Sequence, residues 1–266
     1  MIPTRMASVL FVVVFCALAV FVPVQAEDKP VLPDVENPQP YFSRMAHYIS
    51  SARQFQINMK LGYDVVQESG QKIEFSERRR VTVVRPDRLR VDIEKSDGEK
   101  ALVLFDGKKI TAYSETYQVY AEAESPGNIA DALVYFLRDL KMRMPLALML
   151  TEDFPEEMES RVEALAFVEV SAITDTPCVH MAGRTGQIDF QMWIPQTGNP
   201  LLRRVVITYR DEEGQPNFWA DFVEWDIAPS ISDQAFVFTP PEGAEKIPFL
   251  TEISEGLMDE LPKGGD

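Results

Sequence analysis

The clearest pattern in the chain is a strict alternation of apolar and polar residues from Phe55 to Val65. A period of two over this length predicts a β-strand with one apolar and one solvated face. Further alternating segments follow, separated by the turn sequences Ser69-Gly70, Asp97-Gly98 and Asp106-Gly107. Because the connections are too short for parallel crossovers, the pattern predicts an antiparallel meander, with strands at 54–67, 72–85, 88–95, 100–106, 108–114 and 117–123.

Helical spacing appears before and after this first group of strands. An apolar stripe predicts a helix from about Tyr41, and a second stripe predicts a helix that begins after Asn128 as N-cap. Pro145 begins a third, short helical segment that ends at Leu150 and is apolar on every side. Such a helix must be covered all round or face a ligand. A fourth helix, from Pro155 to Ala164, is charged and expected at the surface.

A second group of strands completes the pattern, with reversals marked by Gly186, Gly198 and Gly214. So many strands with inserted helices predict one wide antiparallel sheet, which curls because strands twist. The predicted fold class is mainly β with α, a half-open barrel with a helical lid. The expected strands of this second group are 165–173, 177–183, 187–194, 201–210 and 216–227.

The N-terminus has the layout of a secretory signal peptide. Arg5 precedes an apolar run from Val9 to Val24, and the segment closes with Val24-Gln25-Ala26, which has small residues at the positions that a signal peptidase reads. We expect cleavage after Ala26 and a periplasmic or secreted product, with an uncleaved anchor as the alternative. The predicted organisation is a signal peptide at 1–26, a Pro-rich linker at 27–40, a folded domain at 41–247 and an acidic tail at 248–266.

Composition narrows the partners and the chemistry of the exported chain. Removal of Arg5 with the leader leaves 25 basic against 42 acidic residues, a net charge of −17. Such a surface repels nucleic acid and anionic lipid headgroups. Cys178 is then the only cysteine, so no intramolecular disulfide can form and the core must hold the fold.

Three segments, in order, resemble the periplasmic lipoprotein carriers of the LolA/LolB-like superfamily. The first runs from Val84-Arg85-Pro86 through the hairpin of Asp106-Gly107 to Tyr113, and the second joins Met192-Trp193-Ile194 to Asn199-Pro200-Leu201. The third is the closing segment 230–244. The likeness covers about 41–247, and within the superfamily the chain is most similar to a group of predicted periplasmic proteins without an assigned function.

The resemblance implies an unclosed barrel whose apolar cavity, capped by helices, accepts the acyl chains of a lipid or lipoprotein. It also implies that Arg85 hydrogen-bonds the lid and holds it shut when the cavity is empty. Arg78, Arg79 and Arg80 make this stretch more cationic than a simple carrier needs. They match an anionic headgroup at the cavity mouth. In so acidic a chain the favoured interpretation is that these arginines are solvated or paired with carboxylates.

The apolar positions of the strands and the lid define the candidate ligand contacts. Ordinary core packing is the competing interpretation for each residue taken singly, whereas methionines around the lid suit a surface that repacks around varied ligands. The predicted ligand-binding set is Phe55, Ile57, Met59, Leu61, Tyr63, Leu89, Val91, Leu133, Phe136, Leu137, Leu146, Met149 and Leu150.

Enzymatic and metal-dependent functions find little support in the sequence. The chain has two histidines, and Cys178 and His180 would share one face of a strand without a further activating group. No catalytic motif or metal-ligand spacing occurs, so no catalytic residue, metal or cofactor is expected. We expect a monomeric, non-enzymatic binding protein for an acyl chain of a lipid or lipoprotein. The alternative is a sensor or scaffold that recognises an envelope protein through the same concave surface.

Overall fold

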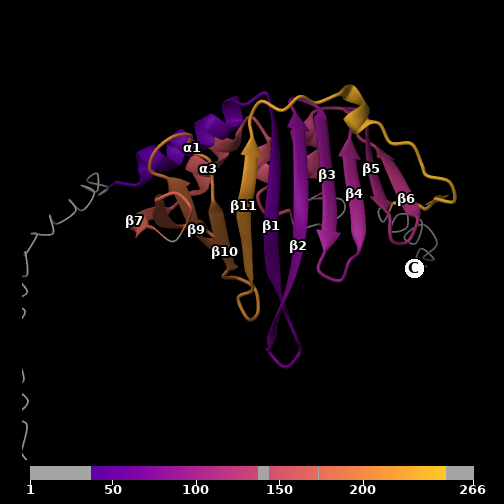
Figure 1. Cartoon of the computed structure of the whole chain (residues 1–266). Helices are drawn as coiled ribbons and strands as arrows, with labels where there is room; N and C mark the ends of the chain where they lie inside the picture. The colour runs from indigo at the N-terminus through magenta and orange to yellow at the C-terminus, as the bar shows by residue number, and fades with distance from the viewer. Residues whose placement is uncertain (1–36, 137–143, 173, 250–266) are drawn as a thin grey trace, which may run out of the picture. The chain divides into compact units, whose positions relative to one another are not determined.

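Twelve strands form a single sheet, with β1 (Gln54–Val66) at its middle (Figure 1). The structure is a computed structural model and describes residues 37–136, 144–172 and 174–249, all within the unit that spans residues 34–266. The remaining strands are β2 (Lys72–Val84), β3 (Arg88–Lys95), β4 (Lys100–Phe105), β5 (Lys109–Ser114), β6 (Val119–Glu124), β7 (Ala164–Ser171), β8 (Cys178–Arg184), β9 (Ile188–Pro195), β10 (Arg204–Tyr209), β11 (Asn217–Asp226) and β12 (Glu245–Lys246).

The two groups of strands leave β1 in opposite directions. β1 pairs with β2 on one side and with β11 on the other, so the strand order is β12-β6-β5-β4-β3-β2-β1-β11-β10-β9-β8-β7. Every pairing is antiparallel except the short one between β12 and β6. β7 and β12 stand at the two ends of the order, so the sheet is open. This confirms the predicted fold class.

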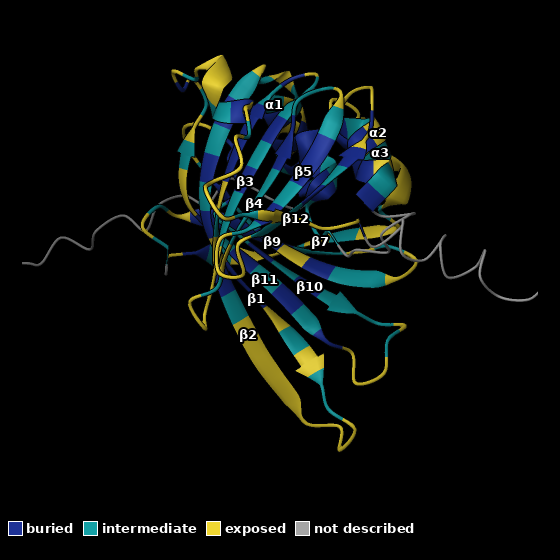
Figure 2. Ribbon diagram, turned by 90° about the vertical axis from the view of Figure 1, so that its right-hand side faces the viewer, coloured by how far each residue is buried: buried dark blue, intermediate teal, exposed yellow. Residues whose placement is uncertain are grey.

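Alternation along each strand separates the sheet into an inner face, which packs on the helices, and an outer face. Phe55, Ile57 and Leu61 point inward and are buried, whereas Gln56 and Asn58 between them are half-buried on the outer face. Burying each large apolar side chain contributes roughly 1.5–3 kcal/mol. Figure 2 shows the helices gathered on one side of the sheet and the β1–β2 hairpin extending beyond them.

Helices cover the inner face and begin where the sequence provides caps. α1 (Gln39–Ser51) has Pro38 and Pro40 at its start, where a fixed φ suits the first turn. α2 (Ile129–Val134) has the predicted N-cap: the side chain of Asn128 accepts from the Asp131 N–H, and the Asp131 carboxylate accepts from the Asn128 N–H. The other helical segments are η2 (Ala147–Leu150), α3 (Phe154–Arg161) and η3 (Asp233–Phe236).

Three details differ from the sequence prediction. α1 begins at Gln39, inside the predicted linker, because the two prolines start the helix and do not extend the chain. The apolar segment after Pro145 is a single 3₁₀ turn, since Leu146 adopts φ +70° and cannot continue an α-helix. Glu245 and Lys246, near the end of the predicted folded domain, form the short strand β12, which the sequence did not predict. The predicted signal peptide lies outside the described residues.

The segment after β11, residues 227–244, is a strap that runs along one end of the neighbouring strands and then down to β12 beside β6 (Figure 1). Phe238 of the strap packs against the rings of Tyr113 and Tyr120, each 5.4 Å away between centroids. Arg90 donates from its guanidinium to the Ala235 carbonyl at 3.0 Å and is held in place by Asp92. The outer face is therefore partly covered, by a segment that polar and aromatic contacts attach to the sheet.

Candidate functional site

The inner face contains an apolar cavity of about 600 Å³ between the helices and the second group of strands. Its volume lies within the range of small-molecule sites, roughly 300–1,000 Å³. The wall of the cavity comes from α2, η2, α3, β9 and β10, and its apolar members are Ala130, Leu133, Val134, Met144, Pro145, Leu146, Ala147, Leu148, Met149, Phe154, Met158, Ile188, Phe190, Met192, Leu202, Val205, Ile207 and Tyr209.

Four methionines are distributed around this cavity, and its polar groups lie toward α3 and the start of β9. Methionine side chains adapt to irregular or variable contents because three flexible bonds lead to a polarizable sulfur. Glu157 and Arg161 form an ion pair on α3, at 2.5 Å between Nη2 and Oε2, and both line the cavity. The cavity therefore has an apolar interior and a pair of charged side chains on α3. The methionines are Met144, Met149, Met158 and Met192.

The predicted contact residues do not all lie at this cavity. Leu133, Leu146 and Met149 line it. Tyr63 lies on the projecting β1–β2 hairpin with 37% of its surface exposed, and Leu137 lies outside the described residues. The remaining predicted residues are buried in the continuous core and are not among those lining the cavity; they are Phe55, Ile57, Met59, Leu61, Leu89, Val91, Phe136 and Leu150.

Sequence reasoning missed the part of the wall that β9 and β10 provide. Ile188, Phe190 and Met192 alternate with polar residues, as do Val205 and Ile207, so each set points to one face. The signal was the same period of two that marked β1. What the sequence lacked was the strand order, which brings β9 and β10 rather than β1 under η2 and α3.

Arg85 connects the end of β2 to two helical segments of the inner face. Its side chain is buried, with 4% of the residue exposed, and its guanidinium carbon lies 5.1 Å from the centroid of the Phe55 ring. Burial lowers the pKa of Arg85 from its usual value, while Glu152 opposes that shift. The guanidinium donates to six main-chain carbonyl oxygens, those of Ile49, Ser50, Ala52, Met149, Leu150 and Thr151.

These hydrogen bonds join the C-terminal end of α1 to η2. Carbonyls at a helix end have no partner within the helix, so a buried guanidinium supplies donors that the fold otherwise lacks. The bonds to Met149, Leu150 and Thr151 place Arg85 behind the 3₁₀ turn that also walls the cavity. The geometry fits the lid contact that the resemblance implied; its action as a latch stays a prediction.

The three consecutive arginines of β2 are divided between the two faces. Arg79 lies opposite Met59 and Ile93 on the inner side and forms an ion pair with Glu77. Arg78 and Arg80 point to the outer face, where Arg80 donates to Asn58 at 3.0 Å. The three side chains therefore do not form one cluster at the cavity mouth.

A protein-family model matches most of the chain. The family described as "Predicted periplasmic protein (DUF2092)" matches residues 39–250. The chain belongs to the DUF2092 family. That description names the compartment that the leader sequence predicted. None of the curated proteins compared with the chain matches it.

Several solved structures are similar to this DUF2092 protein at low identity. A LolA superfamily protein from Nitrosomonas europaea is 10% identical, with 75% of this chain and 97% of that chain covered and a TM-score of 0.42. The lipoprotein LppX from Mycobacterium tuberculosis is 11% identical, with coverages of 73% and 98% and a TM-score of 0.44. A chain of the MucA/MucB complex from Pseudomonas aeruginosa is 17% identical, with 75% of this chain and 60% of that chain covered and a TM-score of 0.39.

Cys178 and His180 share one side of β8 in this DUF2092 protein, as the alternation predicted, but each has other partners. The buried thiol of Cys178 donates to the Thr176 carbonyl at 3.2 Å, and burial raises its pKa. His180 contacts Gln191 at 2.9 Å and stacks on Trp193, 4.1 Å between centroids. The contacts of Cys178 and His180 are thus those of residues packed within a sheet.

Two structural features are absent from the described part of this DUF2092 protein. Among residues 37–136, 144–172 and 174–249, no group of three or more His, Cys, Asp or Glu side chains is arranged to hold a metal ion. Within the same ranges, no helix has the length and apolar character needed to cross a bilayer.

Proposed function

We propose that the chain binds a hydrophobic ligand, the acyl chain of a lipid or lipoprotein, in the cavity between η2, α3 and strands β9 and β10. One observation carries the proposal: an apolar cavity of about 600 Å³ with four methionines in its wall. Each CH₂ group that leaves water contributes about 0.8 kcal/mol, so a twelve-carbon chain gains on the order of 9 kcal/mol before the costs of binding. No special polar chemistry is needed for such a site.

Arg85 is proposed to keep η2 in place over the empty cavity. Its hydrogen bonds to Met149 and Leu150 end on the same turn whose side chains face the ligand space. A ligand that enters or leaves must displace side chains of this turn. Breaking the Arg85 contacts should therefore change the rate of ligand exchange more than the final affinity.

The first experiment asks what the exported protein carries. Protein purified from the periplasm is examined by native mass spectrometry, and a fluorescent fatty-acid probe is titrated into delipidated protein. We expect a co-purified lipid near one per chain and saturable binding of the probe. Repeated absence of lipid together with no saturable binding would refute the proposal.

A matched pair of tryptophan substitutions tests the location of the site. Met192→Trp places an indole in the cavity wall and should weaken probe binding at least tenfold, since the added volume fills ligand space. Val168→Trp adds the same group to β7 at a residue that is 49% exposed and outside the cavity. Equal loss of binding in both variants would mean that the probe binds elsewhere.

The role of Arg85 is tested by Arg85→Lys, which keeps the charge but not the planar set of donors. We expect the probe to dissociate at least threefold faster, measured by stopped-flow displacement. An unchanged dissociation rate in a folded Arg85→Lys variant would reject the latch.

A second candidate function is recognition of a protein partner through the inner face. It is favoured by the β1–β2 hairpin, where Tyr63, Val65, Ile73 and Phe75 expose apolar surface on one side. Tyr63 and Phe75 stack at 6.2 Å between centroids and are 37% and 44% exposed. Photo-crosslinking from position 75 in the periplasm would capture one specific protein if this function holds, and only lipid or nothing if it does not.

A further inference from the structure

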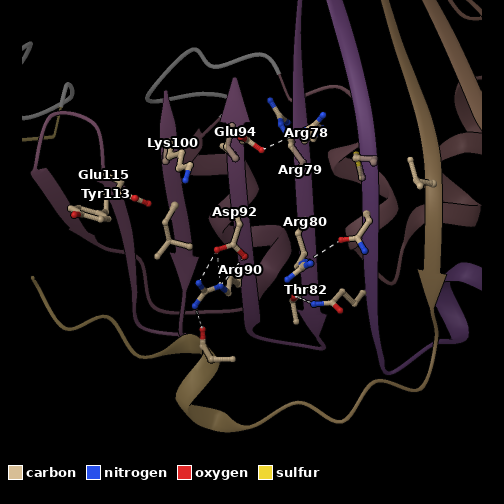
Figure 3. Close-up of a pocket in the computed structure, with 18 of the residues that line it drawn as sticks. Arg78, Arg79, Arg80, Thr82, Arg90, Asp92, Glu94, Lys100, Tyr113 and Glu115 are labelled. Carbon is tan, nitrogen blue, oxygen red and sulfur yellow. Dashed lines mark hydrogen bonds and ion pairs between the residues drawn. The ribbon is translucent and has the colours of Figure 1, made fainter. Parts of the chain in front are cut away.

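The outer face contains a second hollow, separate from the apolar cavity and different in chemistry. It has a volume of about 800 Å³ and lies between strands β1–β5 and the strap (Figure 3). The strap contributes Ser230, Ile231, Ser232 and Ala235, and Arg90 fastens it through the Ala235 carbonyl. This hollow is open to solvent along the face that the helices leave bare.

Positive charge gathers in this hollow although the chain as a whole is strongly acidic. Its outer-face lining includes three carboxylates, Asp92, Glu94 and Glu115, against a larger number of cations. The chain has a net charge of −16, so a local excess of cations runs against the average. The five cations of the outer-face lining are Lys60, Arg78, Arg80, Arg90 and Lys100.

Most of these cations retain unused hydrogen-bond donors. Lys60 lies directly opposite Arg78 in the β1–β2 pairing, a like-charge pair that costs stability in a sheet. Arg78 is 71% exposed and reaches Glu94 only at 3.5 Å. Within the described ranges, the ammonium groups of Lys60 and Lys100 form no ion pair or hydrogen bond. Asp221 lies opposite Lys60 on β11 and Glu94 lies opposite Arg78 on β3, but the Lys60 ammonium and most of the Arg78 N–H groups keep donors for an external anion.

The cations are spread along a row and do not converge on one point. Lys60, Arg78 and Lys100 come from β1, β2 and β4. Figure 3 shows Arg78 and Arg80 on one strand, Arg90 on the next and Lys100 on the strand beyond it. Strands lie about 4.8 Å apart, so β1 and β4 are separated by roughly 14 Å. In an extended peptide, side chains at positions i and i+4 point the same way and lie about 13 Å apart.

We propose that the outer hollow binds an acidic, extended segment of a partner protein, which crosses β1–β4 with its carboxylates toward Lys60, Arg78 and Lys100. Charge complementarity selects the occupant, because the hollow is the cationic part of an acidic surface. Leu102 and Ile231 provide apolar contact beside the cations, and Gln56 and Ser232 provide hydrogen-bonding groups. This mixed lining suits a polypeptide better than a single phosphate, which needs convergent donors. The proposal concerns a different face from the acyl-chain site and does not depend on it.

The test uses the full exported chain and a labelled decapeptide, (Glu-Ser)₅, in fluorescence anisotropy at low ionic strength. The double variant Lys60→Gln/Arg78→Gln should bind the peptide at least about fivefold more weakly, given the small energies of exposed charge pairs. Its matched control, Lys108→Gln/Arg184→Gln, removes the same charge from positions outside the hollow and should change binding less than twofold. Equal weakening in the two variants would show attraction to net charge only and overturn the proposal.

Two further measurements separate other occupants from a partner peptide. If inorganic phosphate displaces the peptide far better than chloride at equal ionic strength, the hollow is a simple anion site and the proposal fails. Residues 250–266 contain Glu252, Glu255, Asp259 and Glu260, and are themselves acidic. If the peptide binds only to a chain that lacks residues 250–266, then that segment, and not a partner protein, occupies the hollow, and the proposal fails. Unchanged peptide binding by Met192→Trp would show that the two faces act independently.

Discussion

The two faces of the sheet are built from the same strands but have opposite properties. On β2, Val81 and Val83 point inward and are buried in the core, whereas Arg80 points outward to Asn58. The inner face is covered by helices and contains an apolar cavity. The outer face contains a cationic hollow, which the strap borders at one end. One chain thus presents an apolar cavity and a cationic hollow on opposite faces of one sheet, because successive side chains point to opposite sides.

The difference also determines what a charged side chain contributes. An arginine on the outer face is screened by water, so its contacts stabilise the fold little. An arginine on the inner face is desolvated, and its hydrogen bonds must replace those it made with water. The same residue type should therefore give very different effects on stability when it is removed from the two faces.

The largest effect is expected for Arg85→Leu. The substitution leaves buried carbonyls of Ile49, Met149 and Leu150 without their donor, and each unsatisfied group costs about 1–3 kcal/mol. We expect the free energy of unfolding to fall by at least about 3 kcal/mol, measured by urea unfolding followed by tryptophan fluorescence.

Arg80→Leu is the matched control for Arg85→Leu, because it removes the same type of side chain from the outer face of β2, the strand that Arg85 follows. Arg80→Leu should lower the free energy of unfolding by less than about 1 kcal/mol. If Arg85→Leu cost no more than Arg80→Leu, the buried hydrogen bonds would not stabilise the junction of α1 and η2. If Arg85→Leu fails to fold, Arg85→Lys gives the same comparison at smaller amplitude.

Local sequence signals predicted most of the strands of this fold. The alternation of β1 and the Gly-containing turns located the hairpins, and Gly70, Gly98 and Gly107 all adopt positive φ. Asn128 capped α2 as expected because capping is a contact between residues three apart. Each of these features depends on neighbours in sequence, so a single chain carries the information.

The site was harder to predict because it depends on which distant strands become neighbours. The pairing of β1 with β11 joins residues more than 150 positions apart, and no local pattern encodes it. For that reason the proposed contacts concentrated on β1, whereas the structure brings β9 and β10 to the cavity. The identity of Arg85 was available only through the family resemblance, since an isolated Arg-Pro pair has no distinctive physical signal.

The next effect is the rate at which the Cys178 thiol is alkylated. This rate distinguishes a cysteine packed inside the sheet from a reactive one. The thiolate is the nucleophile, and burial raises the pKa of Cys178, so little thiolate exists near neutral pH. Iodoacetamide at pH 7.5 should alkylate the native protein at least about a hundredfold more slowly than the protein in 8 M urea. Rapid stoichiometric alkylation of the native protein, followed by mass spectrometry, would instead indicate an activated cysteine.

A smaller effect is expected for Arg79→Leu, which tests the division of the three arginines between the faces. Arg79 shields Glu77, whose side chain is only 7% exposed, so its removal leaves a nearly buried carboxylate without its partner. We expect Arg79→Leu to lower the free energy of unfolding by about 1–2 kcal/mol, and Arg78→Leu to lower it by less than about 0.5 kcal/mol. The double variant Glu77→Gln/Arg79→Leu should recover part of the loss. Equal losses at positions 78 and 79 would contradict the assignment of Arg79 to the inner face.

The smallest effect concerns Leu146, where the lid begins over the inner cavity. Its φ of +70° is a left-handed conformation that costs a leucine roughly 1 kcal/mol and costs glycine nothing. Leu148 lies in the same segment, also lines the cavity and does not have positive φ. Leu146→Gly should therefore destabilise the protein about 1 kcal/mol less than Leu148→Gly in urea unfolding, because the first substitution relieves strain while both remove a similar apolar side chain. Equal costs would mean that Leu146 is relaxed, and the lid would then have no strained residue in its described part.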